Sequence, residues 1–136
     1  TLERVPKKLI GKWCIVETRQ LTPNIYEVRG IVEKPKPDEA PSNIGAMGRY
    51  LLTPPIFPII EETAKKLKDK KEIAVADALQ IYFQKGGRAL GWMFEGDHFD
   101  IGSKTGLLRA QVYAGLKHPQ TKEDLKKYLK SLRITS

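Results

Sequence analysis

Apolar and polar residues alternate in two stretches near the start of the chain, and this pattern predicts two β-strands. Residues 12–18 (KWCIVET) and 25–33 (IYEVRGIVE) are rich in β-branched and aromatic side chains, which fit the pleated surface of a sheet. Residues 20–24 lie between them and contain Pro23. We therefore expect a turn at this point and a hairpin of two neighbouring strands.

Prolines interrupt the pattern after the hairpin. Residues 33–43 (EKPKPDEAPSN) contain three of them, and since proline has no N–H to donate to a sheet, this segment predicts a loop. Residues 44–52 (IGAMGRYLL) then predict a strand interrupted by Gly45 and Gly48. Glycine inside a strand marks either a bulge or a place where a ligand approaches the backbone.

Helical spacing dominates the rest of the chain. Thr53 followed by Pro54 is a typical helix start, and the lysine-rich residues 65–71 predict a helix end or a solvated loop. The apolar positions of residues 73–84 suit a helix packed on a sheet. Residues 88–95 (RALGWMFE) predict one more strand.

Two further helices are expected after this strand. Ser103 is placed to cap the first of them, and Thr121, three residues before Asp124, resembles the start of a capping box for the second. The sequence therefore predicts an α/β fold, with a mixed sheet, helices packed over it and a helical C-terminus.

Length and composition limit the class of protein. The chain has 136 residues, 40% hydrophobic and 29% charged, which fits a single globular domain or part of a larger one and excludes wholesale disorder. The longest uncharged stretch, residues 50–60, is eleven residues long and holds three prolines, too short to span a bilayer. Cys14 is the only cysteine, which favours a reducing, cytoplasmic location.

The net charge of +8 raises the question of a polyanionic partner. Six basic and two acidic residues lie in 117–136, so half of the excess belongs to one predicted amphipathic helix. A solvated helix face explains this charge better than a nucleic-acid surface does, and we expect no nucleic acid partner. The chain begins Thr-Leu-Glu-Arg, without Met or an apolar signal core, which indicates a processed chain or a piece of a longer one.

Three features have residue types suited to chemistry. Glu33 and Lys34 precede Pro35 at a strand end, where a carboxylate can accept bonds from sugar hydroxyls and an ammonium group can pair with a phosphate. A simple ion pair is the alternative. Gly48 would let a ligand touch the backbone, or mark a bulge. Asp100 stands just before a helix, where it could bind Mg²⁺ or cap the helix.

Several motifs together resemble the second half of bacterial UTP-glucose-1-phosphate uridylyltransferases. The similar segments are Val32-Glu33-Lys34-Pro35-Lys36-Pro37 with Ala40-Pro41-Ser42-Asn43, then Gly48-Arg49-Tyr50-Leu51-Leu52-Thr53-Pro54, Glu72-Ile73 with Asp77-Ala78-Leu79, Asp100-Ile101-Gly102-Ser103-Lys104 with Gly106, and Gly115-Leu116-Lys117-His118-Pro119. They occur in the family's order and at similar spacing across residues 5–130.

The resemblance implies a fold and a set of site residues. It implies the sugar-1-phosphate-binding half of a Rossmann-like nucleotidyltransferase fold, spanning residues 1–136 as a single partial domain. Glu33 would bind sugar hydroxyls, Lys34 the phosphate of glucose 1-phosphate, and Gly48 would lie against the sugar. Asp100 would be one of two carboxylates on Mg²⁺. UTP would bind through the absent N-terminal half.

The sequence also departs from the family's pattern. Cys14 stands where the family usually has glycine, and Ala76 where it has a hydroxyl residue that faces the sugar. No G-x-G-T-R loop, which the family uses for the triphosphate, occurs in the 136 residues. We therefore expect a chain that is inactive alone and that pairs with an N-terminal half or self-associates. The alternatives are a non-catalytic regulatory or binding module of the same fold and a basic adaptor for polyanions.

Overall fold

The computed structural model describes residues 1–69 and 72–132. The chain divides into two compact units, Thr1–Glu95 and Gly96–Ser136, called here the first and second units. Each is described by itself.

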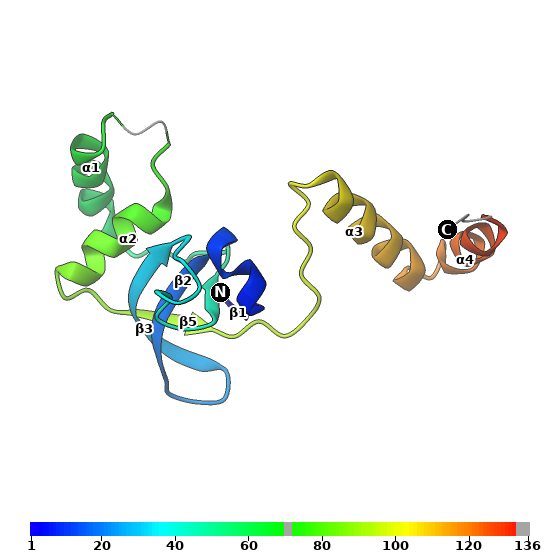
Figure 1. The fold of residues 1–136 in the computed structure, drawn as a ribbon, viewed down its shortest axis with the longest axis horizontal. Helices are drawn as coiled ribbons and strands as arrows, with labels where there is room; N and C mark the ends of the chain where they lie inside the picture. Colours follow the sequence, from blue (N-terminus) through cyan, green and yellow to red (C-terminus); the bar gives the residue numbers. More distant parts are fainter. Residues whose placement is uncertain (70–71, 133–136) are drawn as a thin grey trace. The chain divides into compact units, whose positions relative to one another are not determined.

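The first unit is built on a five-stranded sheet in the order β1-β4-β2-β3-β5, and every strand pairs with its neighbour in the antiparallel sense (Figure 1). β2 and β3 form the predicted hairpin, which is confirmed. The strands are β1 Leu2–Arg4, β2 Cys14–Gln20, β3 Ile25–Glu33, β4 Ile44–Ala46 and β5 Ala89–Trp92.

The sheet curls until its first and last strands meet. Leu2 of β1 forms a parallel bridge with Met93, just after β5, and the N–H of Phe94 donates to the Leu2 carbonyl at 2.8 Å. Gly91 permits this approach, because a Cβ there would lie 2.4 Å from the Leu2 side chain. Some backbone N–H and C=O groups of the two edge strands therefore form hydrogen bonds with each other instead of remaining unpaired.

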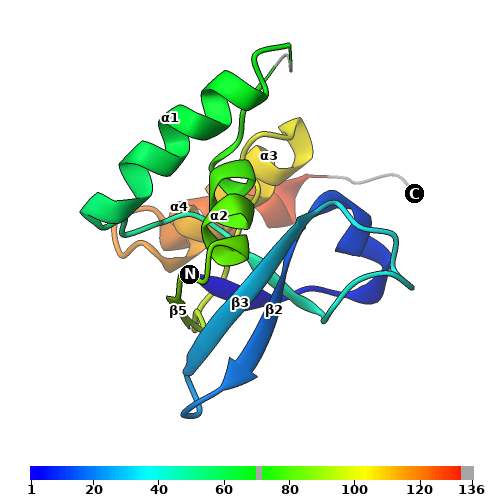
Figure 2. The same cartoon turned by 90° about the vertical axis from the view of Figure 1, so that its left-hand side faces the viewer.

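Helices cover one face of this sheet. A 3-10 turn, η2 (Pro54–Ile56), leads into α1 (Phe57–Lys66), and α2 (Val75–Gln84) packs on β3 and contacts α1 (Figure 2). Between α2 and the sheet lies the larger core, whose buried members are Leu2, Val16, Tyr26, Val28, Ile31, Ile44 and Ala76.

A smaller core lies on the opposite face. Ile15 and Val16 are neighbours in β2, so their side chains point to opposite sides of the sheet. Val16 belongs to the larger core, and Ile15 packs with Val5 and Ile10. Ile10 is supplied by a 3-10 helix, η1 (Lys7–Lys12).

The second unit contains two helices that contact each other, α3 (Lys104–Lys117) and α4 (Lys122–Ser131). Gly115 allows the contact, because a Cβ there would lie 2.5 Å from the Leu125 side chain. The predicted helical C-terminus and the α/β fold class are confirmed. None of the helices in the described part of the chain is long and apolar enough to cross a membrane.

The structure corrects the predicted length of one strand. The strand expected over residues 44–52 ends at Ala46. Ala46 pairs with Leu2 and with Cys14, which are the first residues of β1 and β2. Residues 47–52 therefore have no partner in either neighbouring strand, and Gly48 lies in a bend outside the sheet.

One predicted helix end is confirmed, and one predicted helix start is wrong. α1 ends at Lys66, in agreement with the lysine-rich helix end; Lys70 and Lys71 lie outside the described residues. The capping box at Thr121 is wrong, because the Thr121 side chain makes no cap hydrogen bond. Its hydroxyl instead donates to the carbonyl of Gly115 at 2.8 Å, joining the two helices.

Candidate functional site

Glu33 and Lys34 lie together at the end of β3. Glu33 is the last residue of the strand, and the Lys34 ammonium is 3.4 Å from its carboxylate. Both side chains are accessible, with 42% and 62% of their surfaces exposed. The pair can therefore still bind a ligand while remaining in contact.

The backbone of Lys34 adopts an unusual conformation. Its φ is 47°, the only positive value of a non-glycine residue among those the structure describes. Its N–H donates to the Trp13 carbonyl at 2.9 Å, which fixes this geometry. Left-handed backbone is unfavourable for residues with a Cβ, and such strain gathers at functional sites.

Cys14 is the immediate neighbour of Glu33 across the hairpin. The two residues are paired in the register of β2 and β3, and the half-buried thiol is hydrogen-bonded to the Glu33 carboxylate. Burial is the largest of the effects that together raise the pKa of this thiol to about 12; the Glu33 hydrogen bond and the charges of Glu33 and Asp77 act in the same direction, and Lys34 opposes them. Cys14 is thus protonated at neutral pH and can only donate to Glu33.

Asp77 lies at the N-terminal end of α2, close enough to Cys14 for its charge to raise the pKa of the thiol. Its carboxylate accepts a hydrogen bond from the Ala74 N–H at 2.8 Å, while its own N–H donates to the Ala74 carbonyl at 3.0 Å. An acidic group at this position stabilises the start of a helix, through these bonds and through the helix dipole. Ala76, one residue before it, is buried in the larger core.

Residues 47–52, which follow β4, include Tyr50, whose side chain is affected by Cys14 and Glu33. Burial raises the pKa of Tyr50, and the charges of Cys14 and Glu33 contribute, so its phenol lies near both. The Arg49 N–H donates to the Thr1 hydroxyl at 2.9 Å and holds this segment beside β1.

Gly45 in β4 and Gly48 after it differ in their surroundings. At Gly48, a Cβ would meet no atom within 4 Å, so its backbone faces open space. At Gly45, a Cβ would lie 2.6 Å from the side chains of Trp13 and Val5. Gly45 is therefore required for packing in the smaller core, whereas Gly48 remains available to a ligand.

Asp100 belongs to the second unit and lies in a tight turn before α3. One carboxylate oxygen accepts a hydrogen bond from the Gly102 N–H at 3.0 Å. Ser103, as predicted, caps the helix by accepting from the Gly106 N–H at 3.0 Å, so the alternative role of Asp100 as a helix cap is wrong.

A magnesium ion would need more ligands than Asp100. The carboxylate is exposed and is a suitable hard oxygen donor. Within residues 1–69 and 72–132, no three His, Cys, Asp or Glu side chains are grouped so as to hold a metal. Asp100 thus supplies one carboxylate of a type that Mg²⁺ accepts, and the other ligands would have to come from elsewhere, for example from substrate phosphates.

An apolar cavity of about 290 Å³ lies over the larger core. Its floor includes Val16, Ile31 and Phe83, and its rim includes Leu51 and Trp92. Leu51 is 97% exposed and Trp92 is 49% exposed. Because so much apolar surface in one place is unusual for a free surface, this rim is suited to being covered by another polypeptide.

Comparison with known proteins gives a consistent result. The family model described as nucleotidyl transferase matches residues 4–115. UTP--glucose-1-phosphate uridylyltransferase of Streptococcus pneumoniae serotype 4 is 43% identical over 105 residues, which are 77% of this chain and 34% of that protein. The protein of the same name from Streptococcus pyogenes is 35% identical over 93% of this chain and 41% of its own length.

Solved structures agree in fold. A UTP-bound UGPase from Acinetobacter baumannii has a TM-score of 0.81 at 33% identity, covering 97% of this chain and 44% of its own. A UDP-glucose pyrophosphorylase complexed with UDP-glucose has a TM-score of 0.67 at 30% identity, with 96% and 43% covered. The chain thus spans less than half the length of these relatives.

Proposed function

Because the chain belongs to the nucleotidyl transferase family, we propose that it is the sugar-1-phosphate-binding, C-terminal half of a UTP-glucose-1-phosphate uridylyltransferase. The observation that carries this proposal is the Glu33–Lys34 pair. It consists of an accessible carboxylate and an ammonium group 3.4 Å apart, held at a strand end by a left-handed backbone. At Gly48 a Cβ would meet no atom within 4 Å, which leaves its backbone accessible to a ligand.

Each residue has a chemical role in the proposal. The Glu33 carboxylate has acceptor positions for two neighbouring hydroxyls of glucose, and the Lys34 ammonium pairs with the phosphate of glucose 1-phosphate. Gly48 lies against the sugar ring. A phosphate oxygen of glucose 1-phosphate then attacks the α-phosphorus of UTP, the bond to the β-phosphate breaks, and pyrophosphate leaves as UDP-glucose forms.

The catalytic contribution of these residues is positioning. Holding the sugar phosphate in line with the nucleotide converts a bimolecular step into one within a complex. Asp100 would hold Mg²⁺ together with a second carboxylate and the phosphates, and the ion would supply neutralisation of the phosphate charge. Lys34 would neutralise negative charge on the sugar phosphate.

The proposal requires an N-terminal half that binds UTP. The relatives are more than twice as long as this chain, and the G-x-G-T-R motif is not among its 136 residues. We propose that this chain is inactive alone and is completed by such a half, or by self-association, in the cytoplasm. The apolar cavity with its exposed rim residue Leu51 supports a partner surface on the first unit.

One observation favours the second candidate, a non-catalytic binding module. The Cys14 thiol is hydrogen-bonded to Glu33, so it occupies an acceptor position that a sugar hydroxyl would otherwise use. A module that has lost the sugar would keep the fold but would not bind glucose 1-phosphate.

Calorimetry with glucose 1-phosphate and Mg²⁺ tests the two candidates. The catalytic half should bind the sugar phosphate, and Lys34→Ala should weaken binding at least tenfold, since a contact to a charged group contributes about 1.5–3 kcal/mol. Lys36→Ala, two residues away, is the matched control and should leave affinity unchanged. Absence of wild-type binding, or equal effects of the two variants, would contradict the site.

Activity provides the second part of the test. The chain is mixed with a separately expressed N-terminal half of the Streptococcus pneumoniae relative, and release of pyrophosphate is followed with UTP and glucose 1-phosphate. The mixture should be active and each half alone inactive. If the chain binds sugar phosphate but no N-terminal half restores turnover, the binding-module candidate is favoured.

A further inference from the structure

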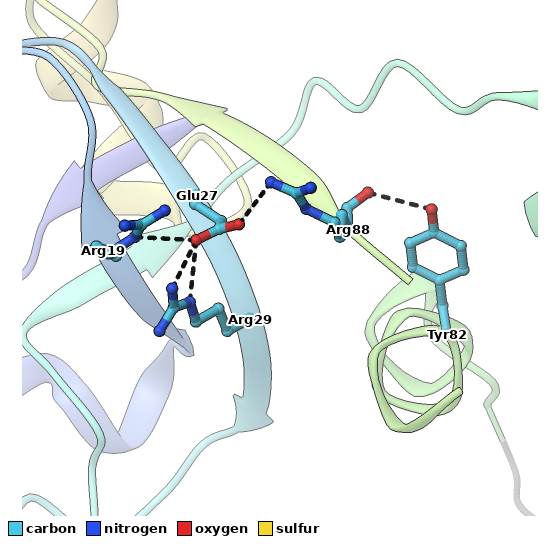
Figure 3. A network of polar contacts seen from close by, with 5 residues as sticks. All are labelled: Arg19, Glu27, Arg29, Tyr82 and Arg88. Atoms are coloured by element: carbon cyan, nitrogen blue, oxygen red, sulfur yellow. Dashed lines mark hydrogen bonds and ion pairs between the residues drawn. The ribbon is translucent and has the colours of Figure 1, made fainter. Parts of the chain in front are cut away.

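Three arginines surround one glutamate on β3 (Figure 3). The Oε2 atom of Glu27 accepts hydrogen bonds from Arg19 at 3.1 Å and from two nitrogens of Arg29 at 3.0 and 2.8 Å. Its Oε1 atom accepts from Arg88 at 2.9 Å. The four residues, called here the arginine cluster, come from β2, β3 and the position just before β5.

The burial of the members is very unequal. Glu27 has 8% of its side chain exposed, whereas Arg19, Arg29 and Arg88 have 58%, 51% and 78%. The arginines cover the carboxylate and face solvent themselves. Their hydrogen bonds, that of Arg29 first, hold the pKa of Glu27 at about 2, so the carboxylate stays charged.

The backbone is shaped to bring these side chains together. Gly30 pairs with Glu17 and Val28 with Thr18, which leaves Arg29 as the extra residue of a β-bulge. Bulges redirect side chains, and Arg29 lies against Glu27. On the other side, Tyr82 of α2 donates its hydroxyl to the Arg88 carbonyl at 3.1 Å and fixes the start of β5.

The cluster carries more positive charge and more donors than Glu27 needs. Three guanidinium groups against one carboxylate give a charge of +2. Each guanidinium has five N–H donors, and the bonds to Glu27 use one nitrogen of Arg19, two of Arg29 and one of Arg88. Most of the donors remain directed at solvent.

A hollow adjoins Arg88 and Glu27 of the cluster. A cavity of about 300 Å³ is lined by Glu27, Arg88, Ala89 and Leu90, a volume at the lower end of small-ligand sites. One opposing charge lies close by, since a carboxylate oxygen of Glu17 is 3.2 Å from the position a Cβ on Gly30 would take. With Glu17 included, the local charge is still +1.

We propose that the arginine cluster is a binding site for a small phosphate-bearing anion, a diphosphate or triphosphate group. Guanidinium groups bind phosphate oxygens through paired N–H donors, and here Glu27 holds three of them in place before the ligand arrives. The site is separate from Glu33 and Lys34 and does not depend on the proposed function. A purely structural role would need Arg19, which pairs with Glu27 across β2 and β3, and Arg88, which joins β3 to β5, and it would leave the charge of Arg29 unexplained.

Calorimetry of the full chain with inorganic pyrophosphate tests the proposal. Arg29→Gln and Arg88→Gln should each weaken pyrophosphate binding at least tenfold, and Arg109→Gln, which removes the same charge from α3, should change it less than twofold. Lys34→Ala should also leave it within twofold, which separates this site from the sugar-phosphate site. Thermal unfolding by circular dichroism verifies that each variant is folded, and two arginine variants are used so that one unfolded protein does not end the test.

Parallel titrations with UTP and uridine identify the source of the phosphate group. Stronger binding of UTP than of pyrophosphate, with no binding of uridine, assigns the site to a nucleotide; the reverse order assigns it to the free anion. The proposal is overturned if the wild type does not bind pyrophosphate or UTP. Equal losses in Arg109→Gln and the cluster variants, or a loss confined to Lys34→Ala, also overturn it.

Discussion

Replacing Lys34 by glycine or by alanine separates its backbone strain from its charge. Both substitutions remove the ammonium group that we propose binds the sugar phosphate. Only glycine also removes the Cβ that makes the φ of 47° unfavourable. The hydrogen bond from the residue's N–H to the Trp13 carbonyl persists in both variants, so the comparison isolates the strain.

The expected stability difference follows from two opposing effects. A left-handed residue with a Cβ costs about 1–2 kcal/mol. Glycine loses roughly 0.5–1 kcal/mol more conformational entropy than alanine on folding. Lys34→Gly should therefore be more stable than Lys34→Ala by about 0.5–1 kcal/mol, which corresponds to a rise in Tm of about 2–6 °C for a chain of this size.

Urea unfolding and calorimetry measure the two consequences separately. We expect Lys34→Gly to unfold at a higher urea concentration than Lys34→Ala, and both to bind glucose 1-phosphate at least tenfold more weakly than the wild type. Equal stability of the two variants would refute the strain argument. Wild-type affinity for glucose 1-phosphate in either variant would refute the role of the ammonium group.

Three further predictions concern other residues. Because the pKa of Glu27 is lowered to about 2, its stabilising effect should be complete above about pH 4.5 and lost as the pH falls towards 2, and Glu27→Gln should flatten this part of the stability curve measured by urea unfolding. Because the pKa of Cys14 is raised to about 12, iodoacetamide should alkylate it on the order of a thousandfold more slowly than a free thiol at pH 8, and Glu33→Gln should speed the reaction, as followed by mass spectrometry. Gly106→Ala would place a Cβ 1.8 Å from the Asp100 carbonyl oxygen. It should therefore shift the amide NMR signals of residues 100–103, while the helix content by circular dichroism changes little, since a gain of about 1 kcal/mol in helix propensity offsets a cap loss of similar size.

Local patterns were enough to predict the elements of the sheet that have strong periodicity. The hairpin of β2 and β3 followed from alternation and from the turn at Pro23, and the Ser103 cap followed from residue type alone. β1 was not predicted, because three residues, Leu2–Arg4, are too few to show a period. The length of β4 could not be predicted for a related reason, since its end is set by where β1 and β2 begin.

Side-chain groupings were predicted only where residues are adjacent in sequence. Glu33 and Lys34 are neighbours, so their pairing was visible. Counting the hairpin register back from the turn would have matched Cys14 with Val32, because the bulge at Arg29 shifts the register by one residue and brings Glu33 opposite Cys14. Arg88 contacts Glu27 across 61 positions, through a strand order that no local signal contains, and the arginine cluster was therefore missed.

The geometry around Glu33 weighs against a module that has merely lost its substrate. A strained lysine costs stability, and strained residues gather at functional sites; here the bond to the Trp13 carbonyl holds the strained backbone in place. The contact of Cys14 with Glu33 at first suggests that the thiol blocks the position of a sugar hydroxyl. Yet its thiol is protonated at neutral pH, so it adds no negative charge that would repel a phosphate, and it can donate a hydrogen bond to Glu33. A carboxylate can accept several hydrogen bonds, which leaves room for sugar hydroxyls on Glu33. Cys14 departs from the family's pattern, but its contact with Glu33 is thus compatible with a glutamate that binds sugar hydroxyls.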